Sequence, residues 1–404
     1  MGNNKSSHAS TSHESHHQNK HQRHEDGPNA LVKQIFLVLS DGGDTISLPQ
    51  LKFKFGDLAL PLFKYLSDDD ESLTPMTVSQ FGKHCQGLIG TSTDIYVKII
   101  QPVEELLKVC FDCAGVPQPK EDDKFLNTLM EDMTSDGSSY DKIVYWKNAN
   151  CPGLCSSIRE KVFDVFYDRR HVNNEYKSDI LSPAQMYILQ AMLPRTIYFP
   201  QTRSESFFRC NNHFLSLNFQ DSKESTDCPW TLLYSSEHQG ISMNRFEATT
   251  FHYKGPTVVI FRKTDHSVFV IANDEEWRHS TKKFGGNNCL LVQILPQFKR
   301  VDGNEMIYCN FKLRSSVFGI MFGRHFSVND DMSDVNTLEV WGCGDDNILL
   351  EQQKQKLRIK RAAEQKGTVP LPGNWDENPD KNILEMAGYE FSTERRDDRP
   401  PDER

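Results

Sequence analysis

Apolar side chains recur at helical spacing from about Asn29 to Phe166. They fall into three main clusters, in which intervals of three and four residues place the apolar side chains on one face of a helix. Residues 29–177 are therefore predicted to form a helical domain. Residues 1–28 hold almost no aliphatic or aromatic side chain, so they cannot offset the entropy of ordering and are expected to form a disordered arm. The clusters are Leu31, Ile35, Phe36 and Leu39; Val103, Leu106, Leu107, Cys110 and Phe111; and Phe125, Leu129 and Met133.

From about Ser178 the pattern changes to β-rich runs separated by turn residues. Residues 178–344 are predicted to form an α+β domain on antiparallel sheet, with a helix at 183–192 before the strands. A strongly helical stretch then covers 347–366, ends at Gly367, and cannot continue through Pro370 and Pro372. Residues 345–404 are thus a basic C-terminal helix and a tail. The predicted strands are 230–234, 257–262, 268–272, 289–295 and 306–313.

Two segments of the helical domain look alike, at 44–51 and 73–81. Each reads as a short strand followed by a hydroxyl residue that can cap the next helix. The pair resembles the short strands between EF-hand loops. With Ile46 at the eighth loop position, the first position falls on Leu39 and the twelfth on Gln50, so the carboxylates that bind calcium are missing. We predict a degenerate EF-hand-like pair without a metal.

The composition of the chain disfavours several classes of protein. A chain of 404 residues with 37% hydrophobic and 25% charged content suits about two or three domains, and no apolar run is long enough to cross a bilayer. The net charge of −10 makes nucleic acid an unfavourable partner. Ten cysteines without a secretory signal indicate reduced cytosolic thiols.

The sharpest short motif is Met1-Gly2-Asn3-Asn4-Lys5-Ser6, which fits the pattern for myristoylation of Gly2 once Met1 is removed. One myristoyl chain gives only reversible attachment, so a second contribution is needed, and we expect a protein partner to supply it. The arm also carries six histidines, which form a polar spacer, bind a metal or gain charge at low pH; the sequence leaves these alternatives open. They are His8, His13, His16, His17, His21 and His24.

Other candidate sites are weak. The pairs Cys110 and Cys113, and Cys151 and Cys155, have spacings that a zinc or redox site could use, but no histidine lies at finger spacing and buried packing is the preferred interpretation. No nucleophile elbow or phosphate-binding loop is present. The cationic helix either packs on its own domain or docks in an acidic groove of a partner, and the residues alone do not decide between these. Its candidate binding residues are Lys354, Lys356, Arg358, Lys360 and Arg361.

The middle of the chain resembles the TLDc domain. The matching segments run from about Ile180 to Cys343 and include 230–246, 254–260, 268–277, 289–292 and 338–342. The resemblance implies two antiparallel sheets with flanking helices. We interpret the tryptophans as core residues between the sheets and the glycines and Pro256 as turn residues. The signature residues are Trp230, Gly240, Gly255, Pro256, Trp277 and Trp341.

The whole arrangement is similar to one subgroup, the N-myristoylated mTOR-associated (Eak-type) TLDc proteins. This resemblance implies a non-enzymatic adaptor in nutrient and insulin (TOR and FoxO) signalling, at the cytosolic face of the plasma or lysosomal membrane or in the cytoplasm. It also implies that the proton pump V-ATPase is a partner bound through the TLDc domain and the C-terminal helix, with covalent myristate and no other cofactor. The chain departs from the family pattern at 265–270 and 314–323, and an insertion separates Pro194 from Trp230.

The alternative that the resemblance supports is an oxidative-stress resistance protein. A thiol peroxidase would need an activated cysteine, for which Cys289 or Cys228 is a candidate. Neither lies in a Cys-x-x-Cys motif or beside an obvious cation that would stabilise a thiolate. We therefore predict that the protein is not an enzyme.

Overall fold

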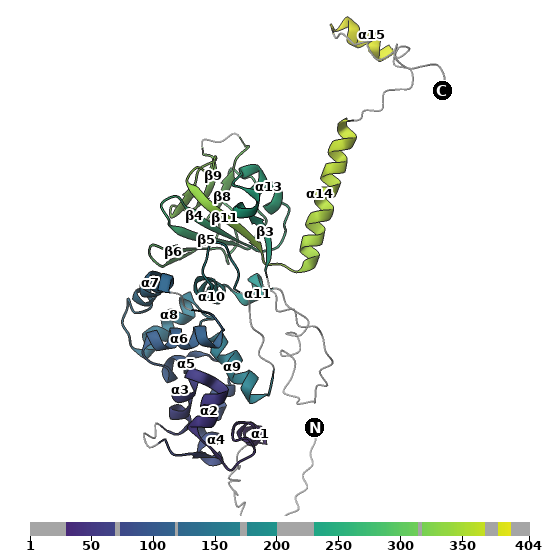
Figure 1. Ribbon diagram of the computed structural model, residues 1–404. Helices are drawn as coiled ribbons and strands as arrows, with labels where there is room; N and C mark the ends of the chain where they lie inside the picture. The colour runs from purple at the N-terminus through teal and green to yellow at the C-terminus, as the bar shows by residue number, and fades with distance from the viewer. Residues whose placement is uncertain are drawn as a thin grey trace, which may run out of the picture. The chain divides into compact units, whose positions relative to one another are not determined.

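The computed structural model describes residues 30–68, 73–117, 120–169, 176–199, 230–313, 317–367 and 379–388 (Figure 1). The predicted arm at 1–28, with Gly2, Lys5, Ser6 and the six histidines, lies outside the described residues. The chain forms two compact units. The first contains Met1–Tyr176 and Pro183–Met192, and the second contains Lys177–Ser182 and Leu193–Arg404. A helical N-terminal region followed by a sheet-rich region is confirmed.

The first unit is helical throughout its described residues apart from two short strands. Helices such as α1 and α7 bury one apolar face, as the spacing of the clusters predicts; in α1 the buried residues are Val32, Ile35, Phe36 and Leu39. The helices are α1 (Ala30–Leu39), α2 (Leu48–Phe55), α3 (Ala59–Leu66), α4 (Val78–Ile89), α5 (Asp94–Ile99), α6 (Val103–Cys113), α7 (Asp123–Met133), α8 (Tyr140–Asn150), α9 (Ser156–Phe166) and α10 (Pro183–Met192), with single 3₁₀ turns at Gly56–Leu58 and Lys120–Asp122.

The predicted pair of short strands is present. Strands β1 (Thr45–Ile46) and β2 (Met76–Thr77) pair antiparallel. After β1 the side chain of Gln50 closes the loop: its Oε1 accepts the backbone N–H of Ser47 at 2.8 Å, and its Nε2 donates to the carbonyl of Ser40 at 3.1 Å. The predicted EF-hand-like alignment assigns Gln50 to the twelfth loop position, where a calcium-binding loop carries glutamate, and this alignment stays a prediction. The amide of Gln50 links Ser40 to Ser47 by these two hydrogen bonds.

Helix α10 belongs to the first unit, whereas the sequence pattern placed residues 183–192 in the domain at 178–344. The physical reason is close packing in the helical core. Tyr187 is hydrogen-bonded to Ser157 at 2.8 Å, and a Cβ added at Gly153 would lie 2.8 Å from the carbonyl oxygen of Ala191. Eight of the ten residues of α10 are buried, which is typical of a helix enclosed by its neighbours.

The second unit contains a six-stranded and a three-stranded antiparallel sheet. The strand order is β3-β11-β4-β5-β6-β7 in the larger sheet and β10-β9-β8 in the smaller one. Strand β11, the last strand among the described residues, lies between β3 and β4. The strands are β3 (Thr231–Ser235), β4 (Thr257–Lys263), β5 (Val268–Asn273), β6 (Leu290–Leu295), β7 (Lys299–Asp302), β8 (Ile307–Asn310), β9 (Gly319–Phe322), β10 (Phe326–Val328) and β11 (Val335–Gly342).

A hydrophobic core draws buried side chains from both sheets. Strand β11 contributes Leu338 and Val340, and the smaller sheet contributes residues such as Ile320 and Phe322. Trp277 belongs to this core, as predicted. Trp230 and Trp341 are also buried, but they are not part of this cluster, so their predicted place between the sheets is corrected. Because side chains alternate along a strand, Trp341 points away from the face that carries Val340.

The described residues of the second unit also form helices, some before β4 in the sequence and some after β11. Helices α11 (Arg195–Tyr198), α12 (Ser236–Gln239) and α13 (Met243–Thr250) lie before β4 in the sequence. The helix predicted at 347–366 is present as α14 (Asp346–Gly367), and α15 (Pro379–Met386) comes after it. α14 is by far the longest described helix of the second unit (Figure 1).

Candidate functional site at the C-terminal helix

Helix α14 begins directly after the central strand β11, and its first turn is capped. The carboxylate of Asp345 accepts the backbone N–H of Ile348 at 3.1 Å. A carboxylate at this position satisfies an amide that has no partner within the helix and interacts favourably with the helix dipole. The first turn of α14 is therefore stabilised by the residue that precedes the helix.

The buried face of α14 rests on Tyr253 and its glycine neighbours. The hydroxyl oxygen of Tyr253, a residue only 1% exposed, accepts the backbone N–H of Gly344 at 2.9 Å. A Cβ added at Gly344 would lie 2.6 Å from Ile348 Cδ1, and one added at Gly255 would lie 2.9 Å from the Tyr253 ring. Gly255 thus permits close approach to the Tyr253 ring, and its role in a tight turn stays a prediction.

One polar side chain fastens the second turn of α14. Gln352 is 2% exposed, and its Nε2 donates to the backbone carbonyls of Thr249 at 2.8 Å and Phe251 at 3.1 Å. These carbonyls belong to the last turn of α13 and the residue after it, so they are groups that have no partner inside that helix. Gln352 joins the end of α13 to α14, and neither it nor Tyr253 was singled out from the sequence. The feature of the sequence that could have pointed to Tyr253 is the group of glycines that pack around its ring in the structure.

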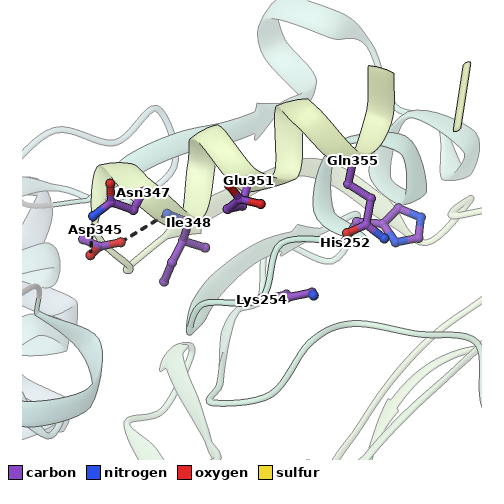
Figure 2. A pocket seen from close by; sticks show the side chains of 7 residues that line it. All are labelled: His252, Lys254, Asp345, Asn347, Ile348, Glu351 and Gln355. Atoms are coloured by element: carbon purple, nitrogen blue, oxygen red, sulfur yellow. Dashed lines mark hydrogen bonds between the residues drawn. The ribbon is translucent and has the colours of Figure 1, made fainter. Parts of the chain in front are cut away.

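A cavity of about 330 Å³ lies beside this contact. Figure 2 shows Ile348, Glu351 and Gln355 on α14 above Lys254 and His252 on the segment that precedes β4. The lining carries both signs of charge. The ammonium group of Lys354, hydrogen-bonded to Glu351 at 2.8 Å, lowers the pKa of that carboxyl. The arrangement fixes a helix on a domain and includes no nucleophile beside a general base.

The cationic residues of α14 do not share one environment. Lys356 is half-buried against the domain, and this burial lowers the pKa of its ammonium group. Lys354, Arg358, Lys360 and Arg361 are exposed, and every residue from 357 to 364 is exposed around the whole helix. The first turns of α14 therefore pack on the domain, and residues 357–364 are exposed; docking of this helix in an acidic groove of a partner stays a prediction.

The other TLDc signature residues make hydrogen bonds within the second unit or end a helix there. Indole nitrogens donate from Trp230 to the carbonyl of Tyr198, from Trp277 to Thr257 Oγ1, and from Trp341 to Glu339 Oε2, at distances between 2.7 and 3.0 Å. Gly240 has a φ of 74° at the end of α12, a conformation that glycine adopts more readily than other residues. The carbonyl of Pro256 accepts the N–H of Cys343 at 2.8 Å, which ties β4 to the end of β11.

Cys289 lacks the features of a reactive thiol. It is 1% exposed, and burial together with its hydrogen bond to Asp274 raises the pKa of the thiol. The Asp274 carboxylate accepts the Cys289 thiol at 3.0 Å and also accepts the backbone N–H groups of Gly286 and Asn288. A raised thiol pKa disfavours the nucleophilic thiolate at neutral pH. Cys228 lies outside the described residues.

The other candidate sites are also accounted for by packing. Cys110, Cys113, Cys151 and Cys155 are buried and are not joined in disulfides, and within the described residues no group of three or more His, Cys, Asp or Glu side chains is placed to hold a metal ion. Asp179 lies between Ser235 Oγ, at 3.3 Å, and His238 Nε2, at 3.7 Å. A hydrolytic triad needs the histidine in the middle position, so this group cannot activate the serine in that way.

None of the described helices combines the length and the apolar character that a membrane span requires. Residues 210–337 match the family model of the TLDc domain. The match covers the segments from β3 into β11 and stops before α14. It therefore supports the fold predicted from the resemblance and does not extend to the C-terminal helix.

Curated relatives in fungi carry the name "Restriction of telomere capping protein 5". The protein of Candida glabrata is 22% identical in a match that covers 39% of this chain and 43% of the relative. That of Pyrenophora tritici-repentis is 40% identical over 58 residues, which are 14% of this chain and 9% of the relative. The chain thus spans less than half the length of these relatives. The sheet-rich unit therefore includes most of a segment, residues 210–337, that matches the TLDc domain model, and part of the chain is similar to these fungal proteins.

Proposed function

We propose that this chain is a non-enzymatic adaptor that binds an acidic partner protein through the exposed turns of α14. The observation that carries the proposal is the buried side chain of Gln352, which fixes the first half of the helix on the TLDc domain. A helix fixed at one end loses less conformational entropy when its free end binds. The TLDc domain and α14 would thus act as one docking module.

The charge of the exposed turns supports an acidic partner. Arg358, Lys360 and Arg361 lie within four consecutive residues, and the only acid in the exposed turns, Glu364, lies 4.0 Å from Lys360. Leu357 and Ile359 are 55% and 48% exposed between these cations. Cations around a few apolar side chains suit a groove with an acidic rim and an apolar floor.

The resemblance to the N-myristoylated mTOR-associated subgroup supports the V-ATPase as this partner. It also supports a role in nutrient and insulin signalling through TOR and FoxO. In this proposal the protein acts at the cytosolic face of the plasma or lysosomal membrane and needs no cofactor other than covalent myristate.

Myristoylation of Gly2 would supply the membrane contact. A single acyl chain holds weakly, but two weak attachments strengthen each other through effective concentration. Labelling cells with an alkyne analogue of myristate tests this part. We expect Gly2→Ala to lose the label and to move the protein from the membrane fraction to the cytosol, and unchanged fractionation of this variant would contradict the tether.

Charge reversal in the exposed turns tests the docking proposal. We expect Arg358→Glu, Lys360→Glu and Arg361→Glu together to weaken binding to the purified V-ATPase by roughly tenfold or more, because close charge pairs at an interface contribute on the order of 1 kcal/mol or more each. The matched control reverses three other exposed lysines of the same unit: Lys282, Lys283 and Lys299. Equal binding of the α14 variant and the control would refute the docking site.

A further inference from the structure

A groove of about 230 Å³ lies in the helical unit, between the first turn of α1 and the end of α4. Three of the side chains that line it are aliphatic, and none of the lining residues is charged. The groove is smaller than the roughly 300–1,000 Å³ typical of small-molecule sites, so a flexible alkyl chain that enters in part suits it better than a rigid ring system. The lining residues are Leu31, Val32, Gln86, Ile89 and Gly90.

The packing of α1 against α4 explains why space remains at this end. Farther along the two helices, Phe36 packs edge-on against Phe81, with ring centroids 5.8 Å apart. At the groove, α4 ends at Ile89, and Gly90 follows without a side chain. A Cβ added at Gly90 would lie no closer than 3.4 Å to any residue other than its chain neighbours. The aromatic pair thus holds the helices together, and the missing side chain leaves room beside Ile89.

The chain itself carries an occupant for this groove. Ala30 is the first described residue, and Leu31, which lines the groove, follows it directly. The arm at 2–29 therefore joins the helical unit at the edge of the groove. Residues 2–29 contain no Val, Ile, Leu, Met, Phe, Tyr or Trp. Myristoylation of Gly2, which is part of the proposed function, would give the arm its one large apolar group.

The length of the arm lets this group reach the groove. Residues 2–29 are 28 positions, and a disordered chain of that length, as the sequence predicts for this arm, has a root-mean-square end-to-end distance of about 30 Å. Such a tether gives an effective concentration of about 1 mM. Burial of about six methylene groups corresponds to a dissociation constant of about 0.3 mM. Roughly three quarters of the molecules would then hold the acyl chain in the groove.

We propose that the groove between α1 and α4 holds the myristoyl chain of Gly2 of the same molecule when the protein is off the membrane. The proposal rests on the acylation of Gly2 in the proposed function. The groove and the bilayer compete for one acyl chain, so the groove weakens an attachment that is already reversible. Stable attachment then requires the second contact, through α14, and the helical unit makes the tether conditional on a partner.

Hydrogen exchange of the purified full chain tests the groove directly. The protein is produced with and without N-myristoyltransferase, and its mass shows whether Gly2 is acylated. We expect peptides that cover 30–39 and 78–90 to exchange roughly fourfold more slowly in the acylated protein, because three-quarters occupancy reduces the free form by that factor. Gly90→Leu should abolish this difference by filling the groove. The backbone at Gly90, with φ −61° and ψ 170°, accepts a leucine without strain.

Membrane binding of the same proteins gives a second readout. On vesicles of four parts phosphatidylcholine to one part phosphatidylserine, we expect Gly90→Leu to raise the partition coefficient of the acylated protein roughly fourfold, because the acyl chain is no longer withheld. Leu31→Ser, which removes an aliphatic lining residue, should act in the same direction. The matched control is Leu37→Ser, which changes a leucine of the same helix that is 54% exposed and does not line the groove. Without myristate, all of these proteins should bind equally.

Equal exchange of the acylated and non-acylated parent, or equal partitioning of the acylated parent and Gly90→Leu, overturns the groove proposal; an acylated parent that binds vesicles still supports the tether. Protection that depends on protein concentration also overturns the proposal, because the acyl chain then comes from a second copy. An unchanged mass after treatment with N-myristoyltransferase refutes the tether and the groove together. If Gly90→Leu has a lower melting temperature than the non-acylated parent, the comparison of Leu31→Ser with Leu37→Ser decides.

Discussion

Replacing Gln352 by alanine should release α14 from the TLDc domain without unfolding the domain. The side chain is 2% exposed and makes two hydrogen bonds, to the carbonyls of Thr249 and Phe251. Each such bond contributes about 1 kcal/mol, and a buried carbonyl left without a partner adds to the loss. We therefore expect the contact of α14 with the domain to weaken by about 2 kcal/mol, which is roughly thirtyfold in an equilibrium constant.

Hydrogen exchange measured by mass spectrometry is the suitable assay, because local opening of a helix sets the exchange of its amides. Peptides that cover 346–356 should exchange roughly thirtyfold faster in Gln352→Ala, whereas peptides from β4 and β5 should be unchanged. Gln353→Ala is a close control: the residue type and the helix are the same, but the side chain is exposed. Similar exchange in the two variants would refute the assigned role of Gln352.

The remaining predictions concern pH and calcium. Burial alone would raise the pKa of Glu247, but the hydrogen bond and charge of Lys312 outweigh it and lower that pKa below its ordinary 4.5. The parent protein should therefore have a larger free energy of unfolding than Glu247→Gln, with the full difference above pH 4.5 and a smaller difference as the pH falls further. Calorimetry across that range measures this difference. A difference that grows on acidification would contradict the prediction. Gln50→Ala should lower the melting temperature by about 3–6 °C, because the loop loses its bonds to Ser47 and Ser40, and added calcium should not restore it. If Gln50→Ala has the same melting temperature as the exposed control Gln86→Ala, or recovers its melting temperature when calcium is added, the role of Gln50 is disproved.

Several elements were predictable because they depend on local patterns. The apolar spacing of α1, α6 and α7 gives their buried faces, and runs rich in β-branched residues mark β4, β5 and β6. Strands β7, β9, β10 and β11 were not predicted as runs of their own. The first three have three or four residues each, and β7 alternates little between apolar and polar positions. Strands this short are defined by their pairing partners more than by their own residues.

The placement of α10 shows that the order of segments in the sequence does not by itself assign a helix to a domain. Its place next to the strands in the sequence favoured the TLDc domain, yet its buried faces are covered in the helical unit. The glycines show the same limit. Gly240 is explained by its φ of 74°, a local property, whereas Gly255 and Gly344 are explained by the ring of Tyr253 and the side chain of Ile348.

The sequence by itself determined that this chain has a helical part, a part built on antiparallel sheet and a cationic helix after it. Periodicity and helix-ending residues act over a few positions, so these features are visible without a fold. Only the tertiary structure decided that Gln352 holds the first turns of that helix, that α1 and α4 leave a groove between them, and that Cys289 is buried beside Asp274. Each of these depends on groups distant in sequence or on burial, and both are consequences of packing that no local pattern records.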